Sequence, residues 1–373
     1  MKIVFTGGGT GGHIYPILAI IREMKKISPQ TFYYIGPKTR FGLKELQKER
    51  VILKTITTGK LRRYKKISAI FQNIIDVVFK IPWGILSAVF ALKSIEPDLI
   101  LSKGGYGALP VIIANKLFKF PLFIHESDSI AGKTTNLAAK QAVAIFTSFD
   151  DTEIEGNFQN KIIVTGNPIR KELLFGNENE AKKIFNLSGE KPLILILGGS
   201  QGAEEINELV LAILPQLLEK FEIIHQCGEK NLDNTDLLYR TIVENKELDK
   251  YYHLYGFLNE EQIKHALAGA HLVVSRAGAA AIFEIAALGK PSILIPLLNS
   301  AQGHQAKNAY LYAKNGAAEV LEPENPTPHM LYSALIKIFS HPENLKEMEK
   351  AALKFSKPEA GERIAKYLVL AKG

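Results

Sequence analysis

Short apolar runs alternate with longer amphipathic stretches along the whole chain. The runs are rich in Val, Ile, Leu and Phe, and the stretches between them repeat apolar residues at helical spacing. Short continuous apolar runs are typical of strands buried on both faces, and amphipathic stretches are typical of helices that cover a sheet. The alternation therefore predicts an α/β protein built on parallel sheets.

The apolar runs place the predicted strands in two series. In the first half we predict strands at Ile3–Thr6, Thr31–Ile35, Leu53–Thr57, Leu99–Ser102, Leu122–His125, Ala144–Thr147 and Ile162–Thr165. In the second half we predict strands at Leu193–Leu197, Glu222–His225, His253–Tyr255, Leu272–Ser275, Ser292–Ile295 and Ala318–Leu321.

Each half opens with the same unit, a strand followed by a Gly-Gly-Ser/Thr-x-Gly turn and a helix. This repetition predicts two doubly wound, Rossmann-like domains that face a central cleft. We place the N-terminal domain at residues 1–165 and the C-terminal domain at 166–356. Helical patterns at Thr327–Ser340 and Glu343–Ser356 follow the last strand, and we expect the tail, residues 357–373, to pack back on the first domain.

The first glycine-rich turn, Gly7–Gly12, lies between a predicted strand and a helix predicted over Ile14–Ile27. This arrangement aims backbone N–H groups and the positive end of a helix at an anion, and glycine lets a phosphate approach closely. Pro16 suits the first turn of that helix. His13 adds a titratable group at the mouth of the predicted anion site.

This turn matches neither common nucleotide-binding signature. Its glycines fit G-x-G-x-x-G, but no acidic residue follows the second predicted strand, where a nicotinamide-binding domain would use one to hold the ribose. The lysine of the phosphate-binding P-loop is also absent. We therefore predict an anion-binding turn of another kind.

Three further glycine-rich turns follow predicted strands, at Lys103–Gly107, Gly198–Gly202 and Ser275–Ala279. The carboxyl ends of parallel strands line the ligand site of a doubly wound sheet, so four such turns favour phosphate binding over mere tight turns. Arg276 precedes a predicted helix whose N-terminus could hold a diphosphate, and Glu284 on that helix could accept hydrogen bonds from a ribose. Because Glu284 lies among apolar residues, it needs a partner.

Two other stretches carry polar groups suited to a sugar substrate. Gln305 and Asn308 share one helical face, and their amides could bind hydroxyl groups or simply cap the helix. His125, Glu126 and Asp128 follow a predicted strand and are candidate general bases. Glu126 and Asp128 offer too few oxygen ligands for a divalent cation, so we predict no metal site and no cofactor.

Composition and charge limit the kinds of binding partner that we expect for this chain. The chain has 373 residues, one cysteine and a net charge of +8. The basic residues are concentrated unevenly, because residues 1–165 carry a net charge of +11 and residues 166–373 a net charge of −3. An anionic partner is therefore expected for the first half, either a membrane surface or nucleic acid. No nucleic-acid-binding signature is present, which argues against the second.

A membrane surface fits one segment of the first half. Residues 60–66 carry five basic residues, and apolar residues follow at helical spacing as far as Trp83. A basic cluster beside an apolar helical face predicts that the 60–83 segment lies on an anionic membrane. The apolar stretch is interrupted by polar residues, so we expect no uncharged run long enough to span a bilayer, and Lys2 leads straight into a strand, so we expect no signal peptide.

Together these motifs resemble the family of peptidoglycan glycosyltransferases that add N-acetylglucosamine to a lipid-linked muramyl-pentapeptide. The resemblance extends over nearly the whole chain and rests on Gly8–His13, His125-Glu126 with Ala131-Gly132 and Thr135-Asn136, Gly166–Arg170, Gly198–Gly202, and Arg276 to Glu284. It implies the two-domain GT-B fold, a peripheral location on the cytoplasmic face of the plasma membrane, UDP-N-acetylglucosamine as donor and no required metal.

The resemblance also implies roles for single residues. Thr10, Gly11 and Gly12 would lie near the donor and the acceptor diphosphate, and Arg170 and Ser200 would contact the phosphates or uridine. Leu258 would offer its backbone to the uracil, and Gln305 would contact the sugar. The phosphates and ribose would be held by Arg276, Ala279, Ala280, Ala281, Ile282, Phe283 and Glu284. The family often has asparagine where this chain has Asp128.

The implied reaction is an inverting transfer of N-acetylglucosamine to the 4-hydroxyl of the muramic sugar. We favour His13 as the general base, because a helix N-terminus disfavours imidazolium, with Glu126 and Asp128 as rivals. Alternative enzymes of the same fold are a diacylglycerol glycosyltransferase and a UDP-sugar 2-epimerase. A nucleotide-binding or nucleic-acid-binding module that uses the basic half is the alternative that is not an enzyme.

Overall fold

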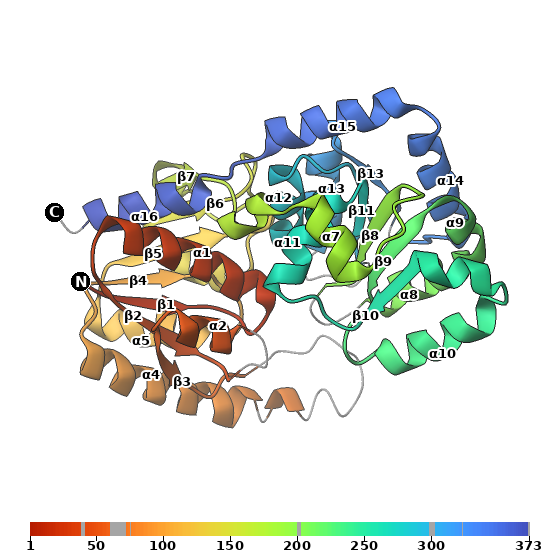
Figure 1. Cartoon of the computed structure of the whole chain (residues 1–373). Helices are drawn as coiled ribbons and strands as arrows, with labels where there is room; N and C mark the ends of the chain where they lie inside the picture. The colour runs from red at the N-terminus through yellow and green to blue at the C-terminus, as the bar shows by residue number, and fades with distance from the viewer. Residues whose placement is uncertain are drawn as a thin grey trace. The chain divides into compact units, whose positions relative to one another are not determined.

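The structure is a computed structural model, and it describes residues 1–38, 42–59, 72–74, 76–199, 203–297, 303–322 and 324–371. The chain divides into two compact units, residues 1–169 with 358–373, and residues 170–357 (Figure 1). Each unit contains one parallel sheet flanked by helices, as the alternating pattern predicts. The boundary between the units falls after Ile169, four residues beyond the position expected from the sequence.

The first unit has a seven-stranded parallel sheet in the order β3-β2-β1-β4-β5-β6-β7. Its strands are β1 (Lys2–Thr6), β2 (Thr31–Gly36), β3 (Ile52–Thr55), β4 (Leu99–Ser102), β5 (Leu122–Glu126), β6 (Ala142–Thr147) and β7 (Ile162–Val164). Its helices are α1 (Gly11–Ile27), α2 (Leu43–Lys48), η1 (Asp76–Lys80, a π-helix), α4 (Ile81–Ile95), α5 (Leu109–Phe118), α6 (Lys133–Ala139), η2 (Gln159–Lys161) and α16 (Ala360–Leu370).

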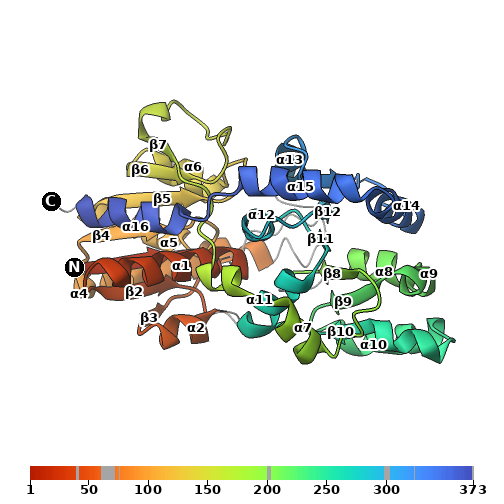
Figure 2. The ribbon, with the colours of Figure 1, turned by 45° about the horizontal axis from the view of Figure 1, so that its top comes forward.

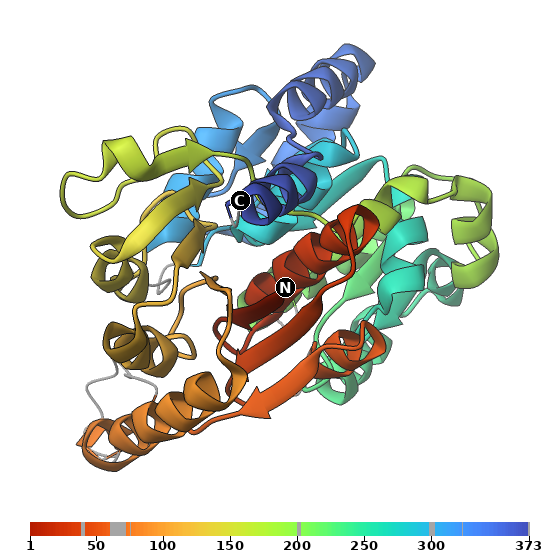
Figure 3. The ribbon, with the colours of Figure 1, turned by 90° about the vertical axis from the view of Figure 1, so that its left-hand side faces the viewer.

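Side-chain alternation along β1 divides this core into two halves. Ile3 and Phe5 pack with α1 and α16 on one face, whereas Val4 packs with α4, α5 and α6 on the other. Helices α1 and α16 lie side by side, although they are at opposite ends of the chain (Figures 2 and 3). The tail therefore contributes Ile364 and Leu368 to the core of the first unit.

The second unit has a six-stranded parallel sheet in the order β10-β9-β8-β11-β12-β13. Its strands are β8 (Leu193–Leu197), β9 (Glu222–Gln226), β10 (Tyr252–Tyr255), β11 (Leu272–Ser275), β12 (Ser292–Leu294) and β13 (Ala318–Val320). Its helices are η3 (Lys171–Phe175), α7 (Glu178–Phe185), α8 (Glu204–Leu211), α9 (Leu214–Lys220), α10 (Leu232–Ile242), η4 (Lys246–Tyr251), α11 (Glu260–Gly269), α12 (Ala279–Ala287), α13 (His304–Ala313), α14 (Pro328–Phe339) and α15 (Pro342–Phe355).

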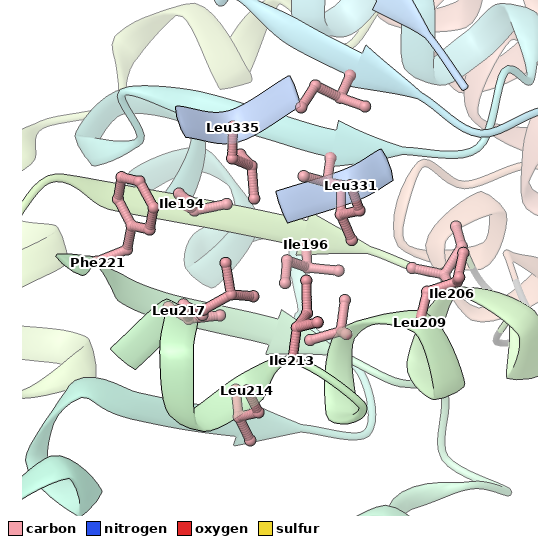
Figure 4. Packing of buried hydrophobic residues seen from close by; sticks show 14 of the residues in the cluster. Ile194, Ile196, Ile206, Leu209, Ile213, Leu214, Leu217, Phe221, Leu331 and Leu335 are labelled. Atoms are coloured by element: carbon pink, nitrogen blue, oxygen red, sulfur yellow. The ribbon is translucent and has the colours of Figure 1, made fainter. Parts of the chain in front are cut away.

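The larger core of this unit lies between the sheet and helices α8, α9 and α14. Ile194 and Ile196 of β8 point into it, and Leu217 of α9 and Leu331 and Leu335 of α14 surround them (Figure 4). Successive residues of a strand point to opposite faces, so Leu193 and Leu195 pack with α7 and α11 on the other side. Every strand predicted from the sequence is present, with ends that differ by at most two residues.

One sequence expectation needs correction. Helix α1 begins at Gly11, three residues earlier than expected, so Pro16 lies inside the helix rather than in its first turn. The glycines give no apolar signal, which is why the periodicity missed this first turn. By length and composition alone, the stretch Gln72–Ile95 could cross a membrane, but charged residues interrupt it, as the sequence indicates.

Candidate functional site

In the first unit, candidate residues gather where the strand order reverses, between the neighbouring strands β1 and β4. Ligands of doubly wound sheets bind at such a switch point, beyond the carboxyl ends of the strands. The turns that begin at Gly7 and at Lys103 follow these two strands. They pack closely, since a Cβ at Gly107 would lie 2.2 Å from the Gly7 carbonyl oxygen, so these two glycine-rich turns form one surface.

His13 is held in this surface by a hydroxyl and two glycines. Thr10, the N-cap residue of α1, makes no side-chain cap bond to the helix backbone, and its Oγ1 lies 2.8 Å from His13 Nδ1 instead. A Cβ at Gly8 or at Gly105 would lie 2.8 Å from the imidazole. These glycines therefore make room for the ring, and Thr10 is placed to set its tautomer.

Lys103 is a charged residue of this region that the sequence analysis named only as the start of a glycine-rich turn, without a role for its side chain. It follows β4 directly, is 4% exposed, and places Nζ 2.5 Å from His125 Nδ1 and 2.6 Å from Ser127 Oγ. Burial lowers the pKa of Lys103 to about 7, although the nearby Glu126 and Asp128 carboxylates oppose the shift. A lysine directly after a short, mostly apolar strand and before a glycine pair was the signal that could have identified it.

Glu126 organises the loop after β5. Its Oε1 accepts a hydrogen bond from the Asp128 N–H at 3.2 Å, and its Oε2 accepts from the Gly132 N–H at 3.2 Å and from Thr135 Oγ1 at 2.6 Å. Burial and the neighbouring Asp128 raise the pKa of Glu126. With protein donors on both oxygens, Glu126 is better suited to hold this loop than to take a proton from a substrate.

His125 and Asp128 differ sharply in accessibility. His125 is fully buried, its Nε2 lies 3.1 Å from the Gly166 carbonyl oxygen, and burial and Lys103 hold its pKa well below the usual value. Both ring nitrogens therefore have protein partners, and the expectation that His125 could act as a base is wrong. Asp128 is half-buried and stays a candidate.

The second unit has an equivalent switch point between β8 and β11. Ser200, in the turn after β8, lies outside the described residues. Helix α12 begins at Ala279 after the N-cap Gly278, and a Cβ at Gly278 would meet no atom within 4 Å. The helix N-terminus is therefore open, and its first N–H groups can bind an anion.

The side chains of α12 divide between the core and this open end. Ile282 and Phe283 are buried in the core, and the Ile282 N–H donates to the Gly278 carbonyl oxygen at 3.1 Å. The side chains of Ile282 and Phe283 are therefore not available to a ligand, and these residues can act on an anion only through the helix dipole. Ala280 and Ala281 are partly exposed in the first turn, where the N–H groups lack helical acceptors.

Arg170 and Glu284 form a two-pronged ion pair. Arg170 Nε and Nη2 donate to the two oxygens of Glu284, each at 2.9 Å, and the side chains are 8% and 14% exposed. This pair supplies the partner that the apolar surroundings of Glu284 require. Arg276, which directly follows β11, is half-buried; burial lowers the pKa of its guanidinium group, which stays protonated.

Leu258 and Gln305 each use one polar group within the protein. The Leu258 N–H donates to Gln226 Oε1 at 3.0 Å, so a uracil contact with this backbone would have to use the carbonyl group. Gln305 Oε1 accepts from the Leu297 N–H at 3.1 Å, which ties α13 to the segment after β12. Asn308 is buried and donates to the Ala277 carbonyl oxygen, so it does not share the role expected for Gln305.

In each unit, candidate residues thus lie in the turns and helix starts that follow the parallel strands, and the structure brings together Thr10 with His13 and Arg170 with Glu284. Among the described residues, no group of three or more His, Cys, Asp or Glu side chains could hold a metal ion. The chemistry available from these side chains is proton transfer at His13 or Asp128 in the first unit and binding of an anion and hydroxyl groups in the second.

Comparison with known proteins shows the family to which the chain belongs. Residues 3–147 match the glycosyltransferase family 28 N-terminal domain, and residues 193–364 match the family 28 C-terminal domain. A Clostridium tetani protein is 35% identical over 371 residues, which are 99% of each chain. A Clostridium botulinum protein is 40% identical over 326 residues, which are 87% of this chain and 86% of the other. Both are named UDP-N-acetylglucosamine–N-acetylmuramyl-(pentapeptide) pyrophosphoryl-undecaprenol N-acetylglucosamine transferase.

Solved structures agree with this match. The crystal structure of Acinetobacter baumannii MurG superposes with a TM-score of 0.72 at 26% identity, and the superposition covers 99% of both chains. A UDP-N-acetylglucosamine 2-epimerase superposes with a TM-score of 0.69 at 14% identity, over 100% of this chain and 96% of the other. The second likeness shows a shared fold only.

Proposed function

The chain belongs to glycosyltransferase family 28, and we propose that it transfers N-acetylglucosamine from UDP-N-acetylglucosamine to the lipid-linked N-acetylmuramyl-pentapeptide of peptidoglycan synthesis. It is a glycosyltransferase of the two-domain GT-B class. The observation that carries the substrate assignment is the 35% identity over 99% of both chains to a relative that bears this name. The lipid-linked acceptor matches the proposed membrane location, on the cytoplasmic face of the plasma membrane.

Two physical demands of this transfer correspond to candidate groups in the two units. The acceptor hydroxyl must lose a proton, and we assign His13 as the base, with Asp128 as the competing candidate. For Nε2 of His13 to accept that proton, Nδ1 must carry a hydrogen that Thr10 Oγ1 accepts across the 2.8 Å contact. Attack from the face opposite UDP then gives the inverted product.

The departing UDP gains negative charge, and the second unit carries groups that can stabilise that charge. The open N-terminus of α12 and the Arg276 cation offer preorganised positive charge. Glu284 oxygens keep lone pairs beyond those used by Arg170, so the same carboxylate can accept hydrogen bonds from ribose hydroxyls. Gln305 is assigned to the sugar hydroxyls.

The decisive experiment measures UDP release from UDP-N-acetylglucosamine in EDTA, with and without a short-chain lipid-linked muramyl-pentapeptide. We expect release only when the acceptor is present, and a roughly 100-fold lower kcat for His13→Asn. His329→Asn, an exposed histidine on α14, is the matched control and should retain full activity. Acceptor-independent conversion of the sugar would point to epimerase chemistry, and full activity of His13→Asn would move the base to Asp128.

We further propose that the first unit associates with an anionic membrane surface through α4. Trp83, Leu86 and Phe90 are spaced three and four residues apart on this helix and are 63%, 45% and 65% exposed. Phe79, in the preceding η1, is 67% exposed. The opposite side of α4 is buried against the sheet, which supports a helix lying on a membrane rather than crossing it. The basic cluster at residues 60–66 lies outside the described residues.

Vesicle sedimentation tests this surface. Replacing both Trp83 and Phe90 with Glu should weaken binding to phosphatidylglycerol-containing vesicles at least about tenfold, because each large apolar side chain contributes roughly 2 kcal/mol on burial. Leu237→Glu, at a 65% exposed position on α10 of the second unit, is the control. Equal binding by the double variant and the control would contradict the assignment of α4.

A further inference from the structure

Gln226 is a buried amide at the carboxyl edge of the second sheet. It is the last residue of β9, the strand that lies between β8 and β10, and it is 6% exposed. A buried amide needs hydrogen-bond partners for its oxygen and its nitrogen, because polar groups without partners destabilise the folded chain. The partners of Gln226 are backbone groups of two different segments, which both lie beyond the ends of neighbouring strands.

The side chain of Gln226 joins these two segments. Its Oε1 accepts a hydrogen bond from the Leu258 N–H at 3.0 Å, and its Nε2 donates to the Gly199 carbonyl oxygen at 3.3 Å. Gly198 adds a third bond, because its N–H donates to the backbone carbonyl oxygen of Gln226 at 3.1 Å. One residue therefore holds the turn after β8 at two points and the segment after β10 at one.

Strand pairing ends at Gln226 on both sides. The last register pair between β8 and β9 is Leu197 with Gln226, and the last pair between β9 and β10 is Tyr255 with Gln226. Beyond these pairs the two segments leave the sheet, so the regular ladder no longer sets the distance between them. The Gln226 amide spans that distance, and both of its bonds lie beyond the last pairs.

The turn held by Gln226 lies beside the cation that we assign to the departing UDP. A Cβ at Gly199 would lie 4.0 Å from Arg276 Cδ, so the Gly199 backbone adjoins the arginine side chain. The φ angle of Gly199 is +80°, a conformation that glycine adopts readily and that leaves no side chain between this turn and an anion. A shift of the turn therefore changes the space in which a phosphate group meets Arg276.

We propose that Gln226 is a positioning residue of the donor site, whose amide holds the turn after β8 beside Arg276 and ties it to the segment after β10. This role rests on the proposed function, because it requires that the second unit binds UDP-N-acetylglucosamine. Loss of the amide leaves the Leu258 N–H and the Gly199 carbonyl group without this partner. The turn is then free to move, and UDP affinity falls.

Calorimetric titration of the full chain with UDP tests this role in Gln226→Met, which keeps the length of the side chain and removes both of its hydrogen bonds. We expect roughly tenfold weaker UDP binding at a temperature well below the unfolding transition. The KM for UDP-N-acetylglucosamine should rise by a similar factor, with the KM for the lipid-linked acceptor within about twofold. Gln141→Met is the matched control, since Gln141 Nε2 donates to the Ile112 carbonyl oxygen at the same 3.3 Å, but in the first unit. This control should bind UDP as the unaltered protein does.

The thermal midpoint separates positioning from stability. Gln226→Met should lower the midpoint by roughly 5 °C, because it leaves buried backbone groups without partners. A lower midpoint with unchanged UDP affinity would overturn the proposal, since a merely structural residue acts on stability alone.

A second variant covers the case in which Gln226→Met does not fold. Gln226→Ala makes room for water at the two backbone groups but leaves the segments untied, so it should fold and bind UDP roughly tenfold more weakly. UDP binding by Gln226→Ala as tight as that of the unaltered protein, or failure of both variants to fold, would contradict the positioning role.

Failure of the proposed function has a different signature. An unaltered protein that binds UDP but shows no acceptor-dependent transfer would refute that function, while weaker UDP binding by Gln226→Met would still support the role of Gln226. An unaltered protein that binds no UDP would refute both.

Discussion

At the scale of single residues, the candidate site depends on side chains that orient other side chains. Thr10 lies at an N-cap, where its hydroxyl ordinarily accepts from a helix N–H, yet here it contacts the His13 ring. A cap bond is worth roughly 1 kcal/mol. Giving up that bond is understandable if a fixed imidazole is needed for function.

Thr10→Val tests this contact, because it keeps the shape of the side chain and removes the hydroxyl. We expect kcat to fall roughly 10- to 100-fold, since the His13 tautomer is no longer specified, with little change in folding stability. Thr10→Ser restores the hydroxyl and should recover most of the activity. A Thr10→Val enzyme as active as Thr10→Ser would show that His13 needs no such partner.

Arg170 and Glu284 provide a second prediction at this scale. Arg170→Lys keeps the charge but cannot form both hydrogen bonds to the Glu284 carboxylate, so we expect about 1–2 kcal/mol lower stability and roughly tenfold weaker UDP binding by calorimetry. The matched control is Arg240→Lys, since the Arg240–Asp236 pair is 70% and 39% exposed. The prediction fails if both variants behave alike.

At the scale of elements, one buried carboxylate stabilises the second sheet at the edge where its parallel strands begin. Glu222, the first residue of β9, is 1% exposed and accepts from the N–H groups of Ser188 and Gly189 and from Ser188 Oγ, and it pairs with His253 Nε2 of β10 at 2.9 Å. Burial alone raises the pKa of Glu222, but these hydrogen bonds outweigh it and lower the pKa. The carboxylate therefore joins two strands and the turn before β8.

Glu222→Gln should cost about 2 kcal/mol of unfolding free energy at pH 7, because it weakens a charge-assisted network. The pKa of Glu222 is lower in the folded protein than in the unfolded chain, where it is near 4.5. The carboxylate therefore contributes its whole stabilising free energy above pH 4.5, and this contribution is lost as the pH falls through the folded-state pKa. Urea unfolding at pH 7, 5 and 4 should therefore show the two proteins converging in acid. Glu219→Gln, at an exposed position on α9, is the control, and parallel curves for Glu222→Gln would contradict this origin of the pH dependence.

At the scale of the whole molecule, the chain ends in the unit in which it began. Tyr367 of α16 packs edge-on against Phe146 at 5.3 Å and Phe123 at 6.1 Å between ring centroids, and Ile364 and Leu368 are fully buried with α1. The first unit therefore includes residues 358–373 as part of its core.

Deleting residues 358–373 should destabilise the first unit by roughly 5 kcal/mol, since two buried aliphatic side chains and one aromatic side chain lose their contacts. Scanning calorimetry should show one transition moving to lower temperature, while the transition of the second unit stays in place. Leu370→Ala, at a 77% exposed position, should shift neither transition. A truncated protein with an unchanged scan would show that α16 is dispensable.

Local patterns in the sequence were enough to predict the strands and helices and to propose the turns that carry the candidate site. Periodicity is a local property, so runs such as Leu193–Leu197 located the strands, and glycines after them located the switch-point turns. Which distant groups meet depends on how the strands are ordered in the folded chain. Arg170 and Glu284 are 114 positions apart, and Lys103 meets His125 and Ser127 because β4 and β5 are neighbours. Strand order and long-range side-chain packing leave no periodic trace, which is why the partners of these charges appeared only in the folded chain.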